Sequence, residues 1–429
     1  MEQTRKQKTL NNDSPLVEGA ASQATALVAR KPIFDLHYKV FGYELLFRDP
    51  AMQPGFGGKT PDAASATVLT DGFELMRPTL RSGQRLFINC TEEVLESELP
   101  TLLPSEICAV EILENVKPTT AVLQAVYKLK QQGYLLALDD YIGQHKLAEF
   151  LPLVDIVKVD VSGKNEDELR RLVDAVHPCN AMLLAEKVED LNTMRLCREL
   201  PFSLFQGFFF AKPKLIKGKK LSPPQKIAFR LMSFAADEKN YFNNVAEAIA
   251  ADVHLTYRLL RYINSVYFGL STEIHSIKQA VTMLGQERFY SWLCVTILAE
   301  LNAEPIAGEL AYISALRGKF LETLALRSGN AKQQRMSASL LLIGLFSLME
   351  SIMNIPMEEA LAPLPLEEAV REALTKGAGP YMPWLSLVNA YERGEWRAVN
   401  NFARQLELTF EDLKAGYAEA ISWTSNILN

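Results

Sequence analysis

Short apolar runs alternate with longer amphipathic stretches through the first half of the chain. In the amphipathic stretches, such as residues 119–133 and 165–178, apolar residues recur every three or four positions, which predicts helices. The apolar runs lie between residues 26 and 213, and they are ALVARKPIF, VFGYELLF, RLFIN, CAVEIL, LLALDD, DIVKVD, MLLAEK and LFQGFFF. Eight predicted strands that alternate mainly with helices indicate an α/β fold, a compact (β/α)8 barrel of the TIM type. A doubly wound open sheet is the alternative.

The first two apolar runs are joined by only a few residues, LHYK at 36–39. Two parallel neighbouring strands need a crossover connection of roughly a dozen residues or more. We therefore expect the first strand pair of the barrel to be antiparallel.

The pattern changes after a Lys-, Pro- and Gly-rich segment, residues 212–226. Beyond it no alternating strand pattern recurs, and runs such as 245–265 and 276–301 have helical period. The length of 429 residues fits two domains. We predict a disordered polar tail over residues 1–25, a barrel over 26–213, a linker over 214–221 and an all-α domain over 222–429.

Composition and charge narrow the class of protein. The formal net charge of −6 argues against a protein that binds nucleic acid by neutralising phosphates. Five scattered cysteines without a C-x-x-C motif argue against a disulfide framework or a zinc site, and favour a reducing, cytoplasmic location. No run approaches the ~20 uninterrupted apolar residues of a membrane span. Small ligands and other proteins are therefore the expected partners.

Polar side chains mark the carboxyl ends of the predicted strands. In a parallel barrel these ends form one rim, where loops vary without disturbing the core. The rim residues are Glu44, Asn89, Glu111, Glu114, Asp139, Asp140, Lys158, Glu186 and Gln206. Carboxylate and amide oxygens suit Mg²⁺ or Mn²⁺ better than they suit zinc. The adjacent Asp139 and Asp140 can coexist when cations lie between them and the other ligands.

A rim of this kind suits one type of chemistry. Two divalent cations bridged by a carboxylate such as Asp139 activate water for in-line attack on a phosphodiester. Lys158, on the same rim, can stabilise the water or the charge that develops on the phosphorus centre. We therefore predict a two-metal carboxylate site with Mg²⁺ or Mn²⁺.

Seven segments of this half resemble the EAL family of cyclic di-GMP phosphodiesterases. In chain order they are ARKPIFDLHYKVFGYELLFR, FINCT, VEILE, ALDDY, DIVKVD, AEKVE and QGFFFAKP. The resemblance implies hydrolysis of cyclic di-GMP to linear pGpG. It also implies metal ligands, namely Glu44, Asn89, Glu111, Asp139 and Asp140.

The same resemblance assigns the other rim residues. Lys158 would contact the nucleophilic water, Glu186 would be the general base, and Gln206 would support the site. Lys31, Arg48 and Glu114 would belong to the substrate-binding region, with Glu114 steadying the loop after a strand.

The second half resembles the HDOD domain over residues 252–285, a relative of HD-type phosphohydrolases. An HD enzyme needs a His-Asp dipeptide and further His ligands for its metals. The chain contains no His-Asp dipeptide and only five histidines. We therefore expect a non-catalytic regulatory domain that binds a protein partner or forms a homodimer.

Three departures from the EAL pattern leave alternatives open. The signature reads ELL, Lys31 stands where the family has Gln, and the loop DDYIGQHKLAEF lacks the usual Gly and Ser residues. Catalysis is the first hypothesis. The second is a degenerate barrel that binds cyclic di-GMP or protein partners without turnover, as an effector or scaffold. The third is another phosphodiester substrate on the same barrel.

Overall fold

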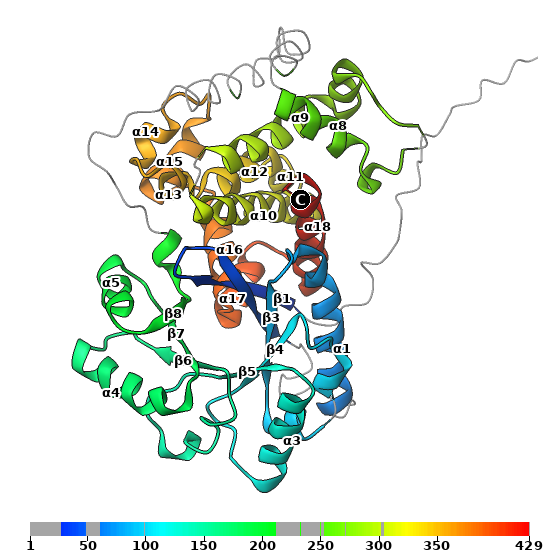
Figure 1. Cartoon of the computed structure of the whole chain (residues 1–429). Helices are drawn as coiled ribbons and strands as arrows, with labels where there is room; N and C mark the ends of the chain where they lie inside the picture. The colour runs from blue at the N-terminus through cyan, green and yellow to red at the C-terminus, as the bar shows by residue number, and fades with distance from the viewer. Residues whose placement is uncertain are drawn as a thin grey trace, which may run out of the picture.

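The structure is a computed structural model with two successive parts, a barrel and a set of helices (Figure 1). The predicted tail and linker lie outside the residues that the structure describes. Those residues are 27–48, 61–97, 99–211, 232, 249, 253–270, 272–301 and 304–428.

Eight strands close into a barrel in which each strand pairs with its neighbours in chain order. They are β1 (Leu27–Asp35), β2 (Val40–Arg48), β3 (Arg85–Cys90), β4 (Cys108–Ile112), β5 (Leu135–Leu138), β6 (Ile156–Asp160), β7 (Met182–Glu186) and β8 (Phe202–Phe205). β1 runs antiparallel to both β2 and β8, and the other pairs are parallel. The predicted barrel and its antiparallel first pair are therefore confirmed, and the open sheet is wrong.

The tight connection between β1 and β2 explains their antiparallel pairing. Asp35 Oδ1 accepts hydrogen bonds from the backbone nitrogens of His37 and Lys39, at 2.8 and 2.9 Å. Tyr38 has a positive φ of 59°, so it adopts the left-handed conformation that a sharp reversal needs. The chain turns back at once, without a crossover helix.

Short helices connect the parallel strands. They are α1 (Pro61–Met76), α2 (Glu92–Glu96), α3 (Thr120–Gln131), α4 (Glu166–Val176) and α5 (Leu191–Glu199). Polar side chains cap four of these helices: Thr91 caps α2, Thr119 caps α3, Asp190 caps α5, and Asn165 forms a capping box with Glu168 on α4. Between β5 and β6 the structure has only the 3-10 turn η4 (His145–Leu147).

The described residues of the C-terminal part form helices joined by turns and loops, without a strand, as the hydrophobic period predicts. Its helices are α8 (Val253–Ile263), α9 (Ile277–Glu300), α10 (Pro305–Arg327), α11 (Ala331–Gln334), α12 (Ser337–Phe346), α13 (Met349–Met353), α14 (Met357–Leu361), α15 (Glu368–Lys376), α16 (Met382–Arg393), α17 (Trp396–Gln405) and α18 (Phe410–Leu428). α10 packs closely against α12. The helices approach so closely that a Cβ atom on Gly344 would lie only 2.2 Å from the backbone nitrogen of Gly318, so this position needs glycine. Within the described residues, no helix has the length and apolar character needed to cross a bilayer.

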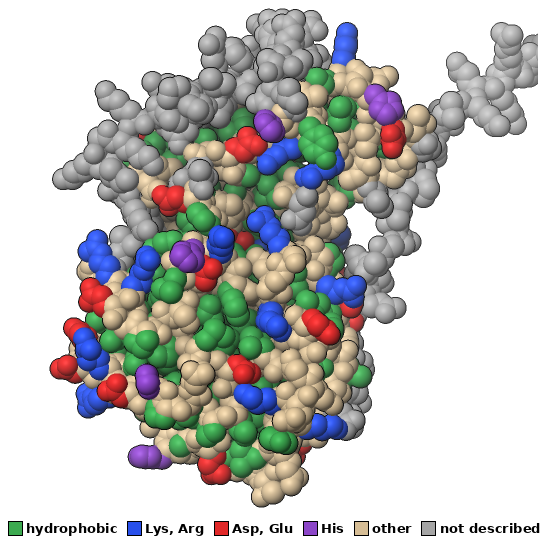
Figure 2. All heavy atoms as spheres, viewed as in Figure 1, with side chains coloured by type: hydrophobic (Ala, Val, Ile, Leu, Met, Phe, Trp, Pro, Cys, Tyr) green, Lys and Arg blue, Asp and Glu red, His purple; other side chains and the backbone are tan. Residues whose placement is uncertain are grey.

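Charged side chains of both signs are interspersed on the face shown in Figure 2. They do not gather there into a patch of one sign, in agreement with the modest net charge of −6. Among the described residues, this face has no basic patch of the kind that neutralises nucleic-acid phosphates.

The barrel and the helices share a buried polar contact through the β1–β2 pair. The Arg30 guanidinium lies between the rings of Tyr43 and Tyr312, 4.0 and 4.1 Å from their centroids. It is 3.5 Å from Glu309 on α10, which also accepts a 2.8 Å hydrogen bond from Tyr43. Arg30 also donates to Thr79 at 3.0 Å. The group ties strands of the barrel to the central helix of the second part.

Replacing Glu309 with alanine is expected to destabilise the full chain by roughly 3–5 kcal/mol, because it leaves Arg30 buried without its carboxylate. The side chains of Arg30 and Glu309 are only 4% and 7% exposed. Urea unfolding measures the change, with Glu287→Ala on the exposed surface of α9 as the matched control. Equal stability of the two variants would show that the Arg30 contact contributes little to folding.

Candidate functional site

One apolar layer fills the lower part of the barrel, and the polar site forms the layer above it. The apolar layer consists of Ile33, Phe87, Ala109, Ala137, Ile156, Leu184 and Leu204. Successive side chains of a strand point to opposite faces, so the residue two positions further along also points inward. For the six parallel strands β3 to β8 these residues are Asn89, Glu111, Asp139, Lys158, Glu186 and Gln206.

The antiparallel β1 and its partner β2 complete the same layer. Because β1 runs in the opposite direction, Lys31 lies two residues before Ile33 and pairs in register with Glu44. Glu44 follows Gly42 by two residues. A Cβ atom at Gly42 would lie 2.9 Å from the Phe87 ring, so glycine leaves the space that this ring fills.

Lys158 lies at the centre of the polar layer and is fully buried. Its Nζ atom is 2.7 Å from Asp139 Oδ1, 2.9 Å from Glu111 Oε1, 2.9 Å from Glu186 Oε1 and 3.7 Å from Glu44 Oε2. One cation therefore faces four carboxyl groups. The structure brings together four of the predicted acidic residues and the predicted lysine.

The four carboxyl groups respond differently to burial. Burial raises the pKa of Glu111 well above its usual value, although Lys158 opposes the shift. Burial, with repulsion from Asp139 and Glu44, raises the pKa of Glu186 to about 8 against the attraction of Lys158. Burial also raises the pKa of Asp139. At these three carboxyl groups the effect of burial on the pKa therefore outweighs the attraction of Lys158.

Glu44 is the exception among the four. Burial acts to raise its pKa, but Lys158, Lys31 and hydrogen bonds from Gln206 and Asn89 together lower its pKa below the usual value. The Gln206 Nε2–Glu44 Oε2 distance is 2.8 Å, and the Asn89 Nδ2–Glu44 Oε1 distance is 3.3 Å. These two amides fix the orientation of an ionised Glu44.

The residues present fit a divalent cation. Besides Glu111 Oε1, which faces Lys158, three buried oxygens of the polar layer accept no hydrogen bond from the described residues: Glu111 Oε2, Asn89 Oδ1 and Glu186 Oε2. Unsatisfied carboxylate and amide oxygens at the mouth of a barrel are hard donors, which Mg²⁺ and Mn²⁺ prefer. Added positive charge would also favour ionisation of the carboxyl groups whose pKa burial raises.

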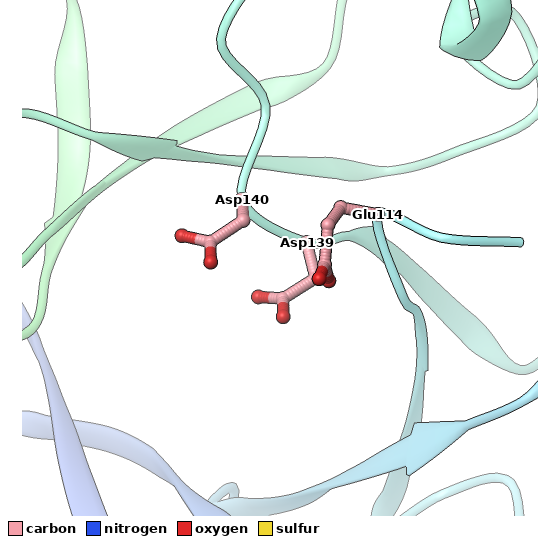
Figure 3. Close-up of side chains that lie close together, drawn as sticks. All are labelled: Glu114, Asp139 and Asp140. Atoms are coloured by element: carbon pink, nitrogen blue, oxygen red, sulfur yellow. The ribbon is translucent and has the colours of Figure 1, made fainter.

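A second group of carboxylates lies beside the first. One oxygen each of Glu114, Asp139 and Asp140 lies within 4.8 Å of the others. Figure 3 shows Glu114 coming from the loop after β4 and both aspartates from the end of β5. Glu114, which the resemblance assigned to steadying a loop, thus offers a third carboxylate beside the two aspartates.

Sequence reasoning missed Lys187, which contacts this second group, and Asp160, which contacts Lys187. Lys187 Nζ lies 3.0 Å from Asp140 Oδ1 and 2.7 Å from Asp160 Oδ2. Both residues could have been assigned to the rim from the sequence, because Lys187 follows Glu186 and Asp160 ends the strand segment VKVD. Their meeting depends on how β6 and β7 pair, with Asp160 in register with Glu186.

A cavity of about 340 Å³ opens above the polar layer. Its barrel wall includes Lys31, Glu44, Asp139, Asp140, Glu186 and Gln206, and its other wall comes from the helices, with Glu309, Arg317, Glu392, Arg393 and Glu395. Arg48 does not line the cavity. Its guanidinium donates instead to the Trp396 carbonyl at 2.7 Å and to Asn400 at 2.8 Å, so the structure places this predicted substrate contact against the helical part.

Comparison with known proteins identifies two domain families in the chain. Residues 79–213 match the EAL domain, and residues 221–356 match the HDOD domain. The chain is 32% identical to "Cyclic di-GMP phosphodiesterase CdgJ" of Vibrio cholerae serotype O1 (strain ATCC 39315 / El Tor Inaba N16961), over 94% of this chain and 93% of that protein. It is 31% identical to YuxH of Bacillus subtilis (strain 168), over 94% and 98%.

Among solved structures, the chain is similar to the Bacillus subtilis YkuI protein, which has an EAL domain and is described in complex with cyclic di-GMP and calcium. The identity is 19% and the TM-score is 0.37, covering 60% of this chain and 73% of that one.

Proposed function

We propose that the barrel hydrolyses cyclic di-GMP to linear pGpG. The premise is that this chain belongs to the family of proteins that join an EAL domain to a C-terminal HDOD domain. The observation that carries the proposal is the buried ring of four carboxyl groups around Lys158, with unsatisfied oxygens at the mouth of the barrel. The relative that bears the name of a cyclic di-GMP phosphodiesterase supports the choice of substrate.

Two sets of residues would hold divalent cations, Mg²⁺ or Mn²⁺. The first set is Glu44, Asn89, Glu111 and Asp139, and the second is Asp139 with Asp140 and Glu114. When bound, such cations lower the pKa of a coordinated water and stabilise the charge that builds up on the phosphate.

Protein side chains supply the rest of the chemistry. Glu186 acts as general base and accepts the proton of the attacking water through its Oε2 atom. This oxygen accepts no hydrogen bond from the described residues. Lys158, 2.9 Å from Glu186 Oε1, holds this carboxylate and stabilises negative charge on the phosphate. Gln206 supports the site through its hydrogen bond to Glu44.

A second candidate function is binding without turnover. Lys187 pairs with Asp140, and this cation competes with a metal ion for one of the two aspartates. Lys31 at the mouth and the altered loop after Asp140 favour the same alternative. In this case the chain is an effector or scaffold that responds to cyclic di-GMP.

We propose that the HDOD domain is regulatory and non-catalytic, and that it binds a protein partner or a second copy of the chain. The sequence has no His-Asp dipeptide with which an HD enzyme binds metal. His254 and His275 are exposed. A cytoplasmic location remains a prediction from the cysteine usage.

The proposal is tested with the purified full chain, cyclic di-GMP and millimolar Mg²⁺ or Mn²⁺. Release of the linear dinucleotide supports catalysis, and cyclic di-AMP under the same conditions tests another phosphodiester substrate. Binding of cyclic di-GMP without product in either metal refutes catalysis and supports the effector alternative.

Asp139→Asn is expected to weaken both metal and dinucleotide binding by at least about tenfold, because it removes charge from the carboxylate shared by the two metal sets. Titration calorimetry with Mn²⁺ and then with cyclic di-GMP measures the two affinities. Asp174→Asn, on the exposed surface of α4, is the control. Unchanged Mn²⁺ affinity in Asp139→Asn would rule out this rim as the metal site.

A further inference from the structure

The cavity above the carboxylates is bounded by both parts of the chain, so a ligand in it meets HDOD residues as well as EAL residues. The C-terminal end of α16 lies at its mouth. Gly394, which ends this helix in the left-handed conformation with φ 69°, packs on Leu46 of β2. Leu46 follows Glu44 by two residues and points to the same side of its strand. The end of α16 is therefore placed directly above a predicted metal ligand.

Among the described residues five basic side chains line the cavity, and three of them lie within about 3.5 Å of carboxylates of the protein. Arg30 contacts Glu309, and Lys187 contacts Asp140 and Asp160. Arg317 forms two hydrogen bonds to Glu392, at 2.7 and 2.6 Å. These cations compensate protein carboxylates and are not available to an anionic ligand.

Arg393 differs from these three. Its Nη1 atom is 3.7 Å from Glu395 Oε1, and both side chains are about half exposed, at 50% and 52%. An exposed pair at this distance is weak. The Arg393 guanidinium carbon lies 4.7 Å above the ring of Phe208, a residue of the barrel turn η6 (Phe208–Ala211) that also lines the cavity. The ring supports the guanidinium at the mouth while its N–H groups remain available.

We propose that Arg393 is a substrate-binding residue supplied by the C-terminal helical part, and that it contacts a phosphate group of the dinucleotide that the barrel binds. This inference rests on the proposed function. A cyclic dinucleotide carries two phosphates, and the metal-binding carboxylates can receive only the one at the reaction centre. The second phosphate needs a cation elsewhere on the wall, and a guanidinium matches phosphate geometry through paired N–H groups. Lys31 faces the same cavity from the barrel side.

The test compares full-length Arg393→Gln and Arg393→Lys with the wild type, each in a Glu186→Gln background so that the ligand is not consumed. Isothermal titration with cyclic di-GMP and Mg²⁺ gives the dissociation constants. We expect Arg393→Gln to raise Kd about 10- to 100-fold, the size of a lost charge-assisted hydrogen bond, and Arg393→Lys to raise Kd less. The salt dependence of Kd should also weaken in Arg393→Gln.

Arg404→Gln is the matched control, because Arg404 is an exposed arginine of α17 that does not line the cavity. Its Kd should equal that of the parent protein. A Kd in Arg393→Gln within twofold of the parent overturns the inference and leaves the proposed function intact. A parent protein that does not bind cyclic di-GMP at all overturns both.

Discussion

The Glu186→Gln variant is expected to hydrolyse cyclic di-GMP ~10²- to 10⁴-fold more slowly than the wild type, the usual contribution of a general base. Glutamine keeps the shape of the side chain and can still face Lys158, but it cannot accept the proton of the attacking water. Dinucleotide binding should change little, because the metal-binding carboxylates remain. Initial rates of linear dinucleotide release, together with titration calorimetry, separate the two effects.

Glu199→Gln provides the control for this experiment, since Glu199 is an exposed glutamate at the end of α5 that does not line the cavity. It should retain wild-type turnover. If Glu186→Gln hydrolysed cyclic di-GMP as fast as the wild type, another group would have to accept the proton and the assigned role of Glu186 would be wrong.

Lys158→Met is expected to lower the free energy of unfolding of the metal-free protein by roughly 3–5 kcal/mol and to abolish hydrolysis. The lysine is fully buried, and removing it leaves four carboxyl groups facing one another without a cation at their centre. Methionine fills a similar volume, so the loss reports charge rather than packing. Urea unfolding in EDTA measures it.

Divalent metal should stabilise Lys158→Met more than it stabilises the wild type, because an ion can replace the missing positive charge. Unfolding curves with and without Mg²⁺ test this directly. The control is Lys187→Met, which removes a half-exposed lysine that pairs with Asp140 and Asp160. Such a pair contributes about 0–1 kcal/mol, so Lys187→Met should unfold nearly as the wild type does. A Lys158→Met protein as stable as Lys187→Met in EDTA would mean that Lys158 does not neutralise the ring.

The strands β1 and β2 contact both the carboxylate site and the C-terminal helices. Arg30 and Tyr43, which contact the HDOD helices, are each followed in the chain by a residue that faces the cavity, Lys31 and Glu44. Strand alternation sends neighbouring residues to opposite faces. The same two strands thus present one face to the carboxylate site and the other to α10.

The sequence alone was enough for the barrel, the antiparallel first pair and most of the polar layer. These features depend on local rules. Strand period sets which side chains point inward, and a connection of a few residues excludes a crossover helix. Asn89, Glu111, Asp139 and Glu186 are therefore identifiable from the strand ends, without any contact between them. The absence of a His-Asp dipeptide is likewise readable without a structure.

Only the tertiary structure decided how these residues meet. Lys158 occupies the centre of the ring because the barrel closes, and Lys187 reaches Asp160 because β6 and β7 pair in that register. Three contacts join residues that are far apart in the chain: Arg48 with Trp396, Arg30 with Glu309, and Arg393 with Phe208. Arg30 and Glu309 are 279 positions apart. Local periodicity carries no information about such contacts, because they depend on where one folded domain docks on another.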